Sequence, residues 1–156
     1  MKNLKKITIV LFGVIALMMF NSCSGSDDTE ARVETSNIPL TYEGRPVNIV
    51  PGNIELGSRN VTFNVWDDQT VDGDIITLSV NGVKVITNYT LTGTKKSITV
   101  TLNNLGYNHV LLYAHNEGTY SPNTAAVSIV DEDGVENNLT LSSTLLTCQA
   151  KNLYVN

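Results

Sequence analysis

Short segments in which apolar and polar residues alternate dominate the chain from residue 46 onward. In N-V-T-F-N-V-W, residues 60–66, every second residue is apolar, and D-I-I-T-L-S-V, residues 74–80, continues the pattern. A period of two is typical of a β-strand with one buried face. Asn81 and Gly82 then separate two alternating runs, and Asn-Gly is the strongest short-range signal for a two-residue β-hairpin turn. The other predicted strands are residues 83–87, 97–102, 109–115, 124–130, 138–141 and 145–155.

These strands predict the fold class. After residue 22, no stretch of ten or more residues has the apolar spacing of a helix. Seven to nine short strands, separated by turn signals about every 8–12 residues, favour an all-β domain, an immunoglobulin-like β-sandwich. A small β-barrel is the competing architecture. The Cys–Trp–Cys pattern of antibody domains is absent, so the term immunoglobulin-like refers here to architecture alone.

The first 22 residues follow a different pattern. Three lysines among the first six residues precede an apolar run, residues 7–20, with one hydroxyl in it. A run of about 14 apolar residues suits the hydrophobic region of a signal peptide, whereas a membrane span needs about 20. The alternative is a short N-terminal anchor helix. The order of basic flank, apolar run and small-residue exit favours a signal peptide over residues 1–22.

The residues at the end of this run predict a lipid anchor. Phe20-Asn21-Ser22-Cys23 resembles the lipobox of bacterial lipoproteins, with Phe20 in place of the usual Leu. The resemblance implies that Cys23 carries lipid and becomes the new N-terminus, and several acyl chains anchor stably where one is marginal. Residues 24–28 (SGSDD) resemble signals that send Bacteroidetes lipoproteins to the outer face of the outer membrane; a polar linker is the other interpretation. We expect a flexible tether over residues 23–45 and the β-sandwich over residues 46–156. The alternative is that the folded part begins at Ile38, because Ile38, Leu40 and Tyr42 alternate with polar or small residues.

Charge and cysteine content narrow the range of partners. Removal of residues 1–22 takes away three lysines, which leaves 7 basic and 15 acidic residues and a net charge of −8. An acidic surface disfavours nucleic acid and anionic lipid headgroups, whereas neutral glycans, cations and other proteins are compatible with it. One of the two cysteines is assigned to lipid. The other, Cys148, lies in the alternating L-L-T-C-Q-A and is predicted to be a small buried core residue.

Four aspartates crowd into residues 67–74, directly behind Trp66. Counted from Asp68, the loop has the front half of an EF-hand ligand pattern, but Ser79 stands where the twelfth-position Glu belongs and the flanks are strand-like, which excludes an EF-hand. One interpretation is a tight turn, because Asp and Gly favour turns. The other is a different calcium loop, because crowded carboxylates repel one another. The candidate metal ligands are Asp67, Asp68, Asp72 and Asp74, completed by oxygens of Asn116, Glu117 or Asn123.

A second polar loop follows the strand predicted at residues 109–115 and is marked by Gly118 and Pro122. Polar groups on a loop held by rigid strands commonly form binding sites. A tyrosine ring there suits stacking on a sugar, and the amides suit its hydroxyls. The structural alternative is a long connection with a capped turn after Pro122. The candidate ligand-binding residues are His115, Asn116, Glu117, Tyr120 and Asn123.

Four motifs together carry a resemblance to a known group of proteins. They are W-D-x(4)-D-G-D from Trp66, then V-N-G, then L-Y-A-x-N-x-G, then P-N-T-A-A. Over residues 61–156 the chain resembles a family of uncharacterised lipoproteins and secreted proteins of Bacteroidetes. In that family an acidic residue often precedes the Asn of the third motif, where this chain has His115. The resemblance implies a shared fold and an envelope location, and it implies no activity.

Catalytic motifs are missing from the sequence. There is no G-x-S-x-G, no metal-binding His pair with a flanking Glu and no phosphate-binding loop. Asp72 and Asp74 lie two apart on a tight turn, whereas a glycosidase needs two carboxylates that face each other across a cleft. The sequence therefore predicts a non-catalytic, surface-tethered binding module for a glycan or a protein, with Ca²⁺ as a candidate cofactor. The alternative is a structural component of an envelope or secretion assembly that has no small-molecule ligand.

Overall fold

The computed structural model describes residues 31–156, which form eleven β-strands and no helix. The predicted signal peptide, the predicted lipidation site Cys23 and residues 24–30 lie outside the described residues. Within residues 31–156, no helix is long and apolar enough to cross a membrane. The strands are β1 (Arg32–Val33), β2 (Thr41–Tyr42), β3 (Arg45–Leu56), β4 (Asn60–Trp66), β5 (Ile75–Val80), β6 (Val83–Thr90), β7 (Lys96–Thr101), β8 (Leu105–Ala114), β9 (Asn123–Asp131), β10 (Glu136–Ser143) and β11 (Cys148–Val155).

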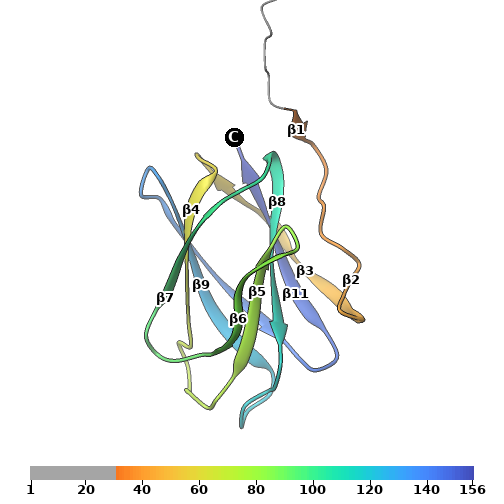
Figure 1. The fold of residues 1–156 in the computed structure, drawn as a ribbon, viewed down its shortest axis with the longest axis vertical. Coiled ribbons are helices and arrows are strands. Elements are labelled where there is room, and N and C mark those ends of the chain that lie inside the picture. Colours follow the sequence, from red (N-terminus) through yellow and green to blue (C-terminus); the bar gives the residue numbers. More distant parts are fainter. Residues whose placement is uncertain (1–30) are drawn as a thin grey trace, which may run out of the picture.

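Two sheets pack face to face, as Figure 1 shows. The larger sheet has the order β2-β3-β11-β8-β5-β6, with β1 added on β8, and the smaller sheet has the order β10-β9-β4-β7. This arrangement confirms the predicted all-β sandwich. The eleven strands among the described residues exceed the predicted seven to nine, because the two-residue strands β1 and β2 and the long β3 were not predicted.

The main core lies between the two sheets. Val61, Phe63 and Val65 of β4 are buried there with Ile76 and Leu78 of β5, each at most 1 % exposed. Burying a side chain of this size contributes about 1.5–3 kcal/mol. The period-two pattern therefore selects the face of each strand that turns inward, as the sequence predicts.

The Asn81–Gly82 hairpin is confirmed, because both residues have positive φ, 49° and 81°, and they join β5 to β6. The pattern fails at β3, which pairs in parallel with β11. Pro51 and Gly52 interrupt its alternation, and the pairing register shifts opposite them, between Lys151 and Asn152. A bulge of this kind lets a strand continue through Pro and Gly, and a single strand's residue pattern does not show it.

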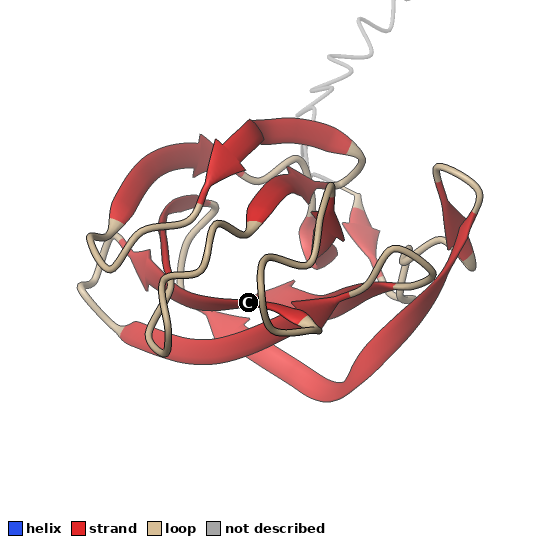
Figure 2. Cartoon of the chain, turned by 90° about the horizontal axis from the view of Figure 1, so that it is seen from below, coloured by secondary structure: helices blue, strands red, loops and turns tan. Residues whose placement is uncertain are grey.

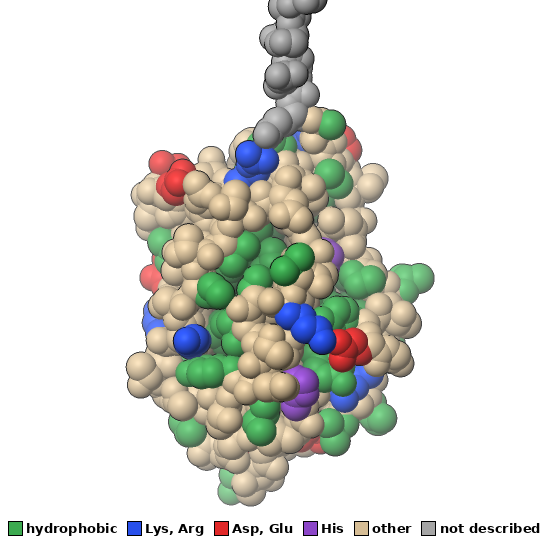
Figure 3. Space-filling view, viewed as in Figure 1, with side chains coloured by type: hydrophobic (Ala, Val, Ile, Leu, Met, Phe, Trp, Pro, Cys, Tyr) green, Lys and Arg blue, Asp and Glu red, His purple; other side chains and the backbone are tan. Residues whose placement is uncertain are grey.

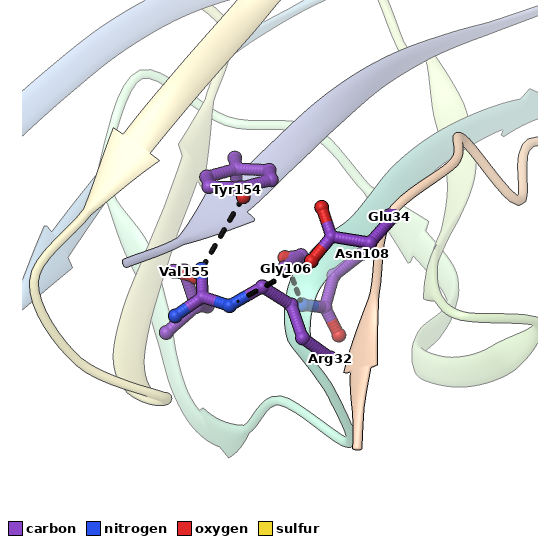
Figure 4. A network of polar contacts seen from close by, with 6 residues as sticks. All are labelled: Arg32, Glu34, Gly106, Asn108, Tyr154 and Val155. Atoms are coloured by element: carbon purple, nitrogen blue, oxygen red, sulfur yellow. Dashed lines mark hydrogen bonds and ion pairs between the residues drawn. The ribbon is translucent and has the colours of Figure 1, made fainter. Parts of the chain in front are cut away.

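Residues 31–45, expected to be part of a flexible tether, are instead folded onto the larger sheet. β1 pairs in parallel with the start of β8, and β2 pairs with β3. Figure 4 shows Arg32 at the end of β11, where its Nη1 donates to the Val155 carbonyl at 3.1 Å. Gly106 permits the pairing of β1 with β8, because a Cβ at residue 106 would lie 2.2 Å from the Val33 carbonyl oxygen. The folded part therefore includes β1 and β2 and does not begin at residue 46.

A second, smaller apolar cluster covers the outer face of the larger sheet. Leu111, Cys148 and Ala150 are buried there beneath Ile38 and Tyr42 of the N-terminal segment, residues 31–45. Cys148 is fully buried, which confirms its predicted place among core residues. Burial raises the pKa of its thiol, and a buried neutral thiol is chemically inert. The N-terminal segment is thus held by packing as well as by strand pairing.

Candidate functional site

The two polar loops lie at the same end of the sandwich. Residues 67–74 lead from β4 in the smaller sheet to β5 in the larger one, and residues 115–122 lead from β8 in the larger sheet to β9 in the smaller one. Figure 2 looks at the molecule from this end and shows the loops bridging the two layers. Because both loops cross between the sheets here, residues 41 or more positions apart meet through hydrogen bonds.

Three carboxylates of the acidic loop converge. One oxygen from each of Asp67, Asp72 and Asp74 lies within 4.8 Å of the other two. Asp67 is 6 % exposed and Asp74 is 4 % exposed. Asp68, predicted to be a fourth ligand, is exposed and lies outside this group. The three carboxylates line an open pocket of about 210 Å³ together with Gln69, Thr70, Tyr120, Pro122 and Thr124.

Asp72 ties the two loops together. Its Oδ2 accepts hydrogen bonds from the backbone N–H groups of Thr119 and Tyr120, both at 2.7 Å. Gly118 makes this approach possible, because its φ is +53° and a Cβ there would lie 2.4 Å from Asp72 Oδ1. Any larger residue at Gly118 would have to displace the carboxylate. The position of Asp72 is therefore fixed by the loop that follows β8.

Asp74 has one satisfied and one unsatisfied oxygen. Its Oδ2 accepts the Thr124 backbone N–H at 3.1 Å, whereas its buried Oδ1 has no hydrogen-bond partner among the described residues. The pKa of Asp74 is raised to about 6, mainly by desolvation on burial and also by the charges of Asp72 and Asp67, against the lowering effect of the Thr124 hydrogen bond. A buried, unpaired carboxylate oxygen costs free energy. A bound cation or a proton removes that cost.

The remaining oxygens suit a hard cation. The hydrogen bonds engage one oxygen of each carboxylate, since Asp67 Oδ1 accepts the Gln69 N–H at 2.9 Å and the Oδ2 atoms of Asp72 and Asp74 are engaged as described. The other oxygen of each carboxylate is left for a ligand. Carboxylate oxygens are the ligands that Ca²⁺ prefers in proteins. The arrangement can therefore hold a divalent cation, and it lacks the spacing of an EF-hand.

Asn116 and Asn123, predicted to be ligands, brace the acidic loop instead. Asn116 bonds the backbone on both sides of Asp74: its Oδ1 accepts the Ile75 N–H at 2.6 Å and its Nδ2 donates to the Gly73 carbonyl at 2.8 Å. Asn123 is fully buried, and its Nδ2 donates to the Asn116 carbonyl at 3.3 Å. Both amides lie outside the lining of the pocket. Their role is to fix the backbone that carries Asp74.

His115 and Glu117 are also directed away from the pocket. His115 Nε2 pairs with the Thr77 hydroxyl at 2.8 Å, and Glu117 Oε1 accepts the Leu145 N–H at 2.8 Å. Of the five predicted ligand-binding residues, Tyr120 is the one that lines the pocket. The other four make hydrogen bonds to neighbouring strands and loops outside that lining, and their part in ligand binding stays a prediction.

Several residues at the site were not predicted. Gln69, Thr70, Pro122 and Thr124 line the pocket, and Gly118 makes room for Asp72. Asp68 lies instead in a separate depression of about 440 Å³ on the smaller sheet, which Trp66 also lines. The sequence does show that both loops connect predicted strands. The two loops come together only if each of them passes from one sheet to the other at the same end of the sandwich, and this depends on the topology.

No model of a known protein family matches the chain, and no curated protein or solved structure matches it. Its function is therefore inferred from the chemistry of the loop end and of the N-terminal sequence.

Proposed function

We propose that the chain is a non-catalytic binding module, anchored to the outer face of the outer membrane by lipid on Cys23, that binds Ca²⁺ at Asp67, Asp72 and Asp74. Two observations carry the cation site: the convergence of the three carboxylates, and the buried Asp74 Oδ1, which has no hydrogen-bond donor among residues 31–156. A turn that was acidic only for solubility would direct its carboxylates to water, whereas two of these three are buried.

The position of the site supports a role in binding away from the membrane. Arg32 pairs beside Leu105 at the start of β8, whereas the candidate site follows the end of β8. The ten residues of β8 span about 30 Å, so Arg32 and the candidate site lie at opposite ends of the sandwich. Residues 24–31 can reach at most about 30 Å. A lipid on Cys23 would thus hold the loop end outward.

The histidine, lysine and arginine side chains support a non-catalytic role and a ligand other than nucleic acid. His109 pairs with Asn37 and His115 with Thr77, so among the described residues neither imidazole is directed into the acidic pocket. On the face shown in Figure 3, the Lys and Arg side chains lie apart from one another and form no basic patch for a polyanion. The pocket offers carboxylates, an aromatic ring and small polar groups, which suit binding.

Thermal unfolding of the purified protein in Ca²⁺ or in EDTA tests the cation site. Calcium at 100 times its Kd should add about 2.7 kcal/mol to the free energy of unfolding, a rise in Tm of about 10 °C. Asp74→Asn and Asp72→Asn should abolish the rise. Asp68→Asn is the matched control, because it removes the same charge one residue away from the group, and it should keep the rise. An identical Tm of the wild type in Ca²⁺ and EDTA refutes the site and favours a structural role in an envelope assembly.

A further inference from the structure

We propose that the calcium ion is shared with a glycan, so that two neighbouring sugar hydroxyls complete its coordination while the sugar ring packs against Tyr120. This inference rests on the cation site proposed above and names the class of ligand for it. Three features of the loop end carry it: the number of oxygens that the protein offers, the position of Tyr120, and the local charge.

The three carboxylates offer fewer oxygens than the ion takes. One oxygen of each accepts a backbone N–H, which leaves the other oxygen for the ion. Ca²⁺ takes six to eight oxygens, so about three to five positions are left, and Gln69 and Thr70, which line the same pocket, offer one side-chain oxygen each. Because the three carboxylates line an open pocket, these positions are accessible from solvent. A pair of adjacent hydroxyls can fill two of them in place of water.

Tyr120 provides a surface for the apolar side of a sugar. Its side chain is 68 % exposed and lines the same pocket, next to Pro122. Tyr120 is also held next to the three carboxylates, because its backbone N–H donates to Asp72 Oδ2 at 2.7 Å. An exposed aromatic ring beside a small number of fixed polar groups is typical of a small-molecule pocket. Here the ring and the ion would contact opposite parts of one sugar.

Local charge selects a neutral ligand. Three carboxylates around a divalent ion leave a net charge of about −1, and Asp68 and Glu117 in the same loops add further negative charge. A carboxylate ligand, such as an acidic peptide side chain, would be repelled, because like charges at close range are unfavourable. A neutral diol has oxygens for the ion and no charge to be repelled. The pocket is small, with a volume of about 210 Å³, and it therefore suits a small ligand such as one sugar residue.

Binding of the purified protein to an array of neutral glycans that end in mannose, fucose or galactose tests the inference, with O-methylated terminal sugars as the control that blocks the diol. We expect binding in Ca²⁺, a loss of at least about tenfold in EDTA, and no binding to the methylated sugars. Tyr120→Ala should lose at least about tenfold in glycan binding while it keeps the calcium-induced rise in Tm. Tyr120→Phe should keep both, because the ring remains.

The outcomes separate the two proposals. A calcium-induced rise in Tm without binding to any glycan of the array overturns the shared coordination and leaves the cation site standing. Equal glycan binding in Ca²⁺ and EDTA also overturns it. Calcium-dependent binding to glycan-free peptides alone assigns the open positions to a protein ligand, and this too overturns the inference. Absence of any calcium effect on Tm removes the cation site and the shared coordination together.

Discussion

Replacement of Asp74 by Asn is expected to stabilise the calcium-free protein at pH 7. Burial and the neighbouring carboxylates raise the pKa of Asp74 from its usual 3.8 to about 6. The folded state therefore holds the proton more tightly than the unfolded state, and the free energy of unfolding falls as the pH rises from about 4 to about 6. Above pH 6 the full cost of the buried charge is present. Asn removes that charge and can still accept the Thr124 N–H.

The size of the effect follows from the same pKa. Each pKa unit corresponds to about 1.4 kcal/mol, so a rise from 3.8 to about 6 is worth at most about 3 kcal/mol. We expect Asp74→Asn to gain about 1–3 kcal/mol over the wild type at pH 7 in EDTA and nothing below about pH 4. Calcium at about 1,000 times its Kd adds about 4 kcal/mol to the wild type alone, which reverses the order of the two proteins.

Urea unfolding of both proteins between pH 4 and pH 8, in EDTA and in Ca²⁺, measures these differences. The lowered pKa of the buried His109 gives the opposite trend, a loss of stability as the pH falls below about 6.5, so the difference between the two proteins is the informative quantity. Asp68→Asn, at an exposed position, should stay within about 0.5 kcal/mol of the wild type. If Asp74→Asn is less stable than the wild type in EDTA at pH 7, the Asp74 charge is already compensated and the reasoning fails.

Two further substitutions test other parts of the structure. Gly118→Ala should weaken calcium binding by at least about tenfold, because the added Cβ would displace the Asp72 carboxylate. Gly134→Ala is the control: Gly134 also has a positive φ, but nothing lies within 4 Å of its Cβ position, so calcium binding should be unchanged. Isothermal titration calorimetry measures both affinities, and equal values would show that Asp72 is not a ligand. Cys23→Ser should release the protein from membranes or leave its signal peptide uncleaved, and a variant that fractionates like the wild type would refute the lipid anchor.

The N-terminal segment shows why part of the fold escaped sequence-based prediction. Ile38 and Tyr42 are partly buried against a sheet whose inner face is already covered, and the polar residues around them match a tether in composition. Arg32 and Gly106 meet across more than 70 positions of sequence. The alternation of Ile38, Leu40 and Tyr42 is too short to fix the boundary of the fold, and the pairing partners that decide it lie far away in the sequence.

The all-β class and the buried face of β4 could be predicted from the sequence, because a strand with one buried face needs an apolar residue at every second position. The Asn81–Gly82 hairpin could be predicted as well, because its turn needs two residues that tolerate positive φ. The sequence also singled out the acidic loop. Tertiary structure decided which carboxylates converge: Asp67, Asp72 and Asp74 do and Asp68 does not, because loops that cross between the sheets at one end place the backbone N–H groups of residues 119–124 against them. The hydrogen bonds that engage His115, Asn116, Glu117 and Asn123 depend on that same crossing, and no spacing along the chain encodes it.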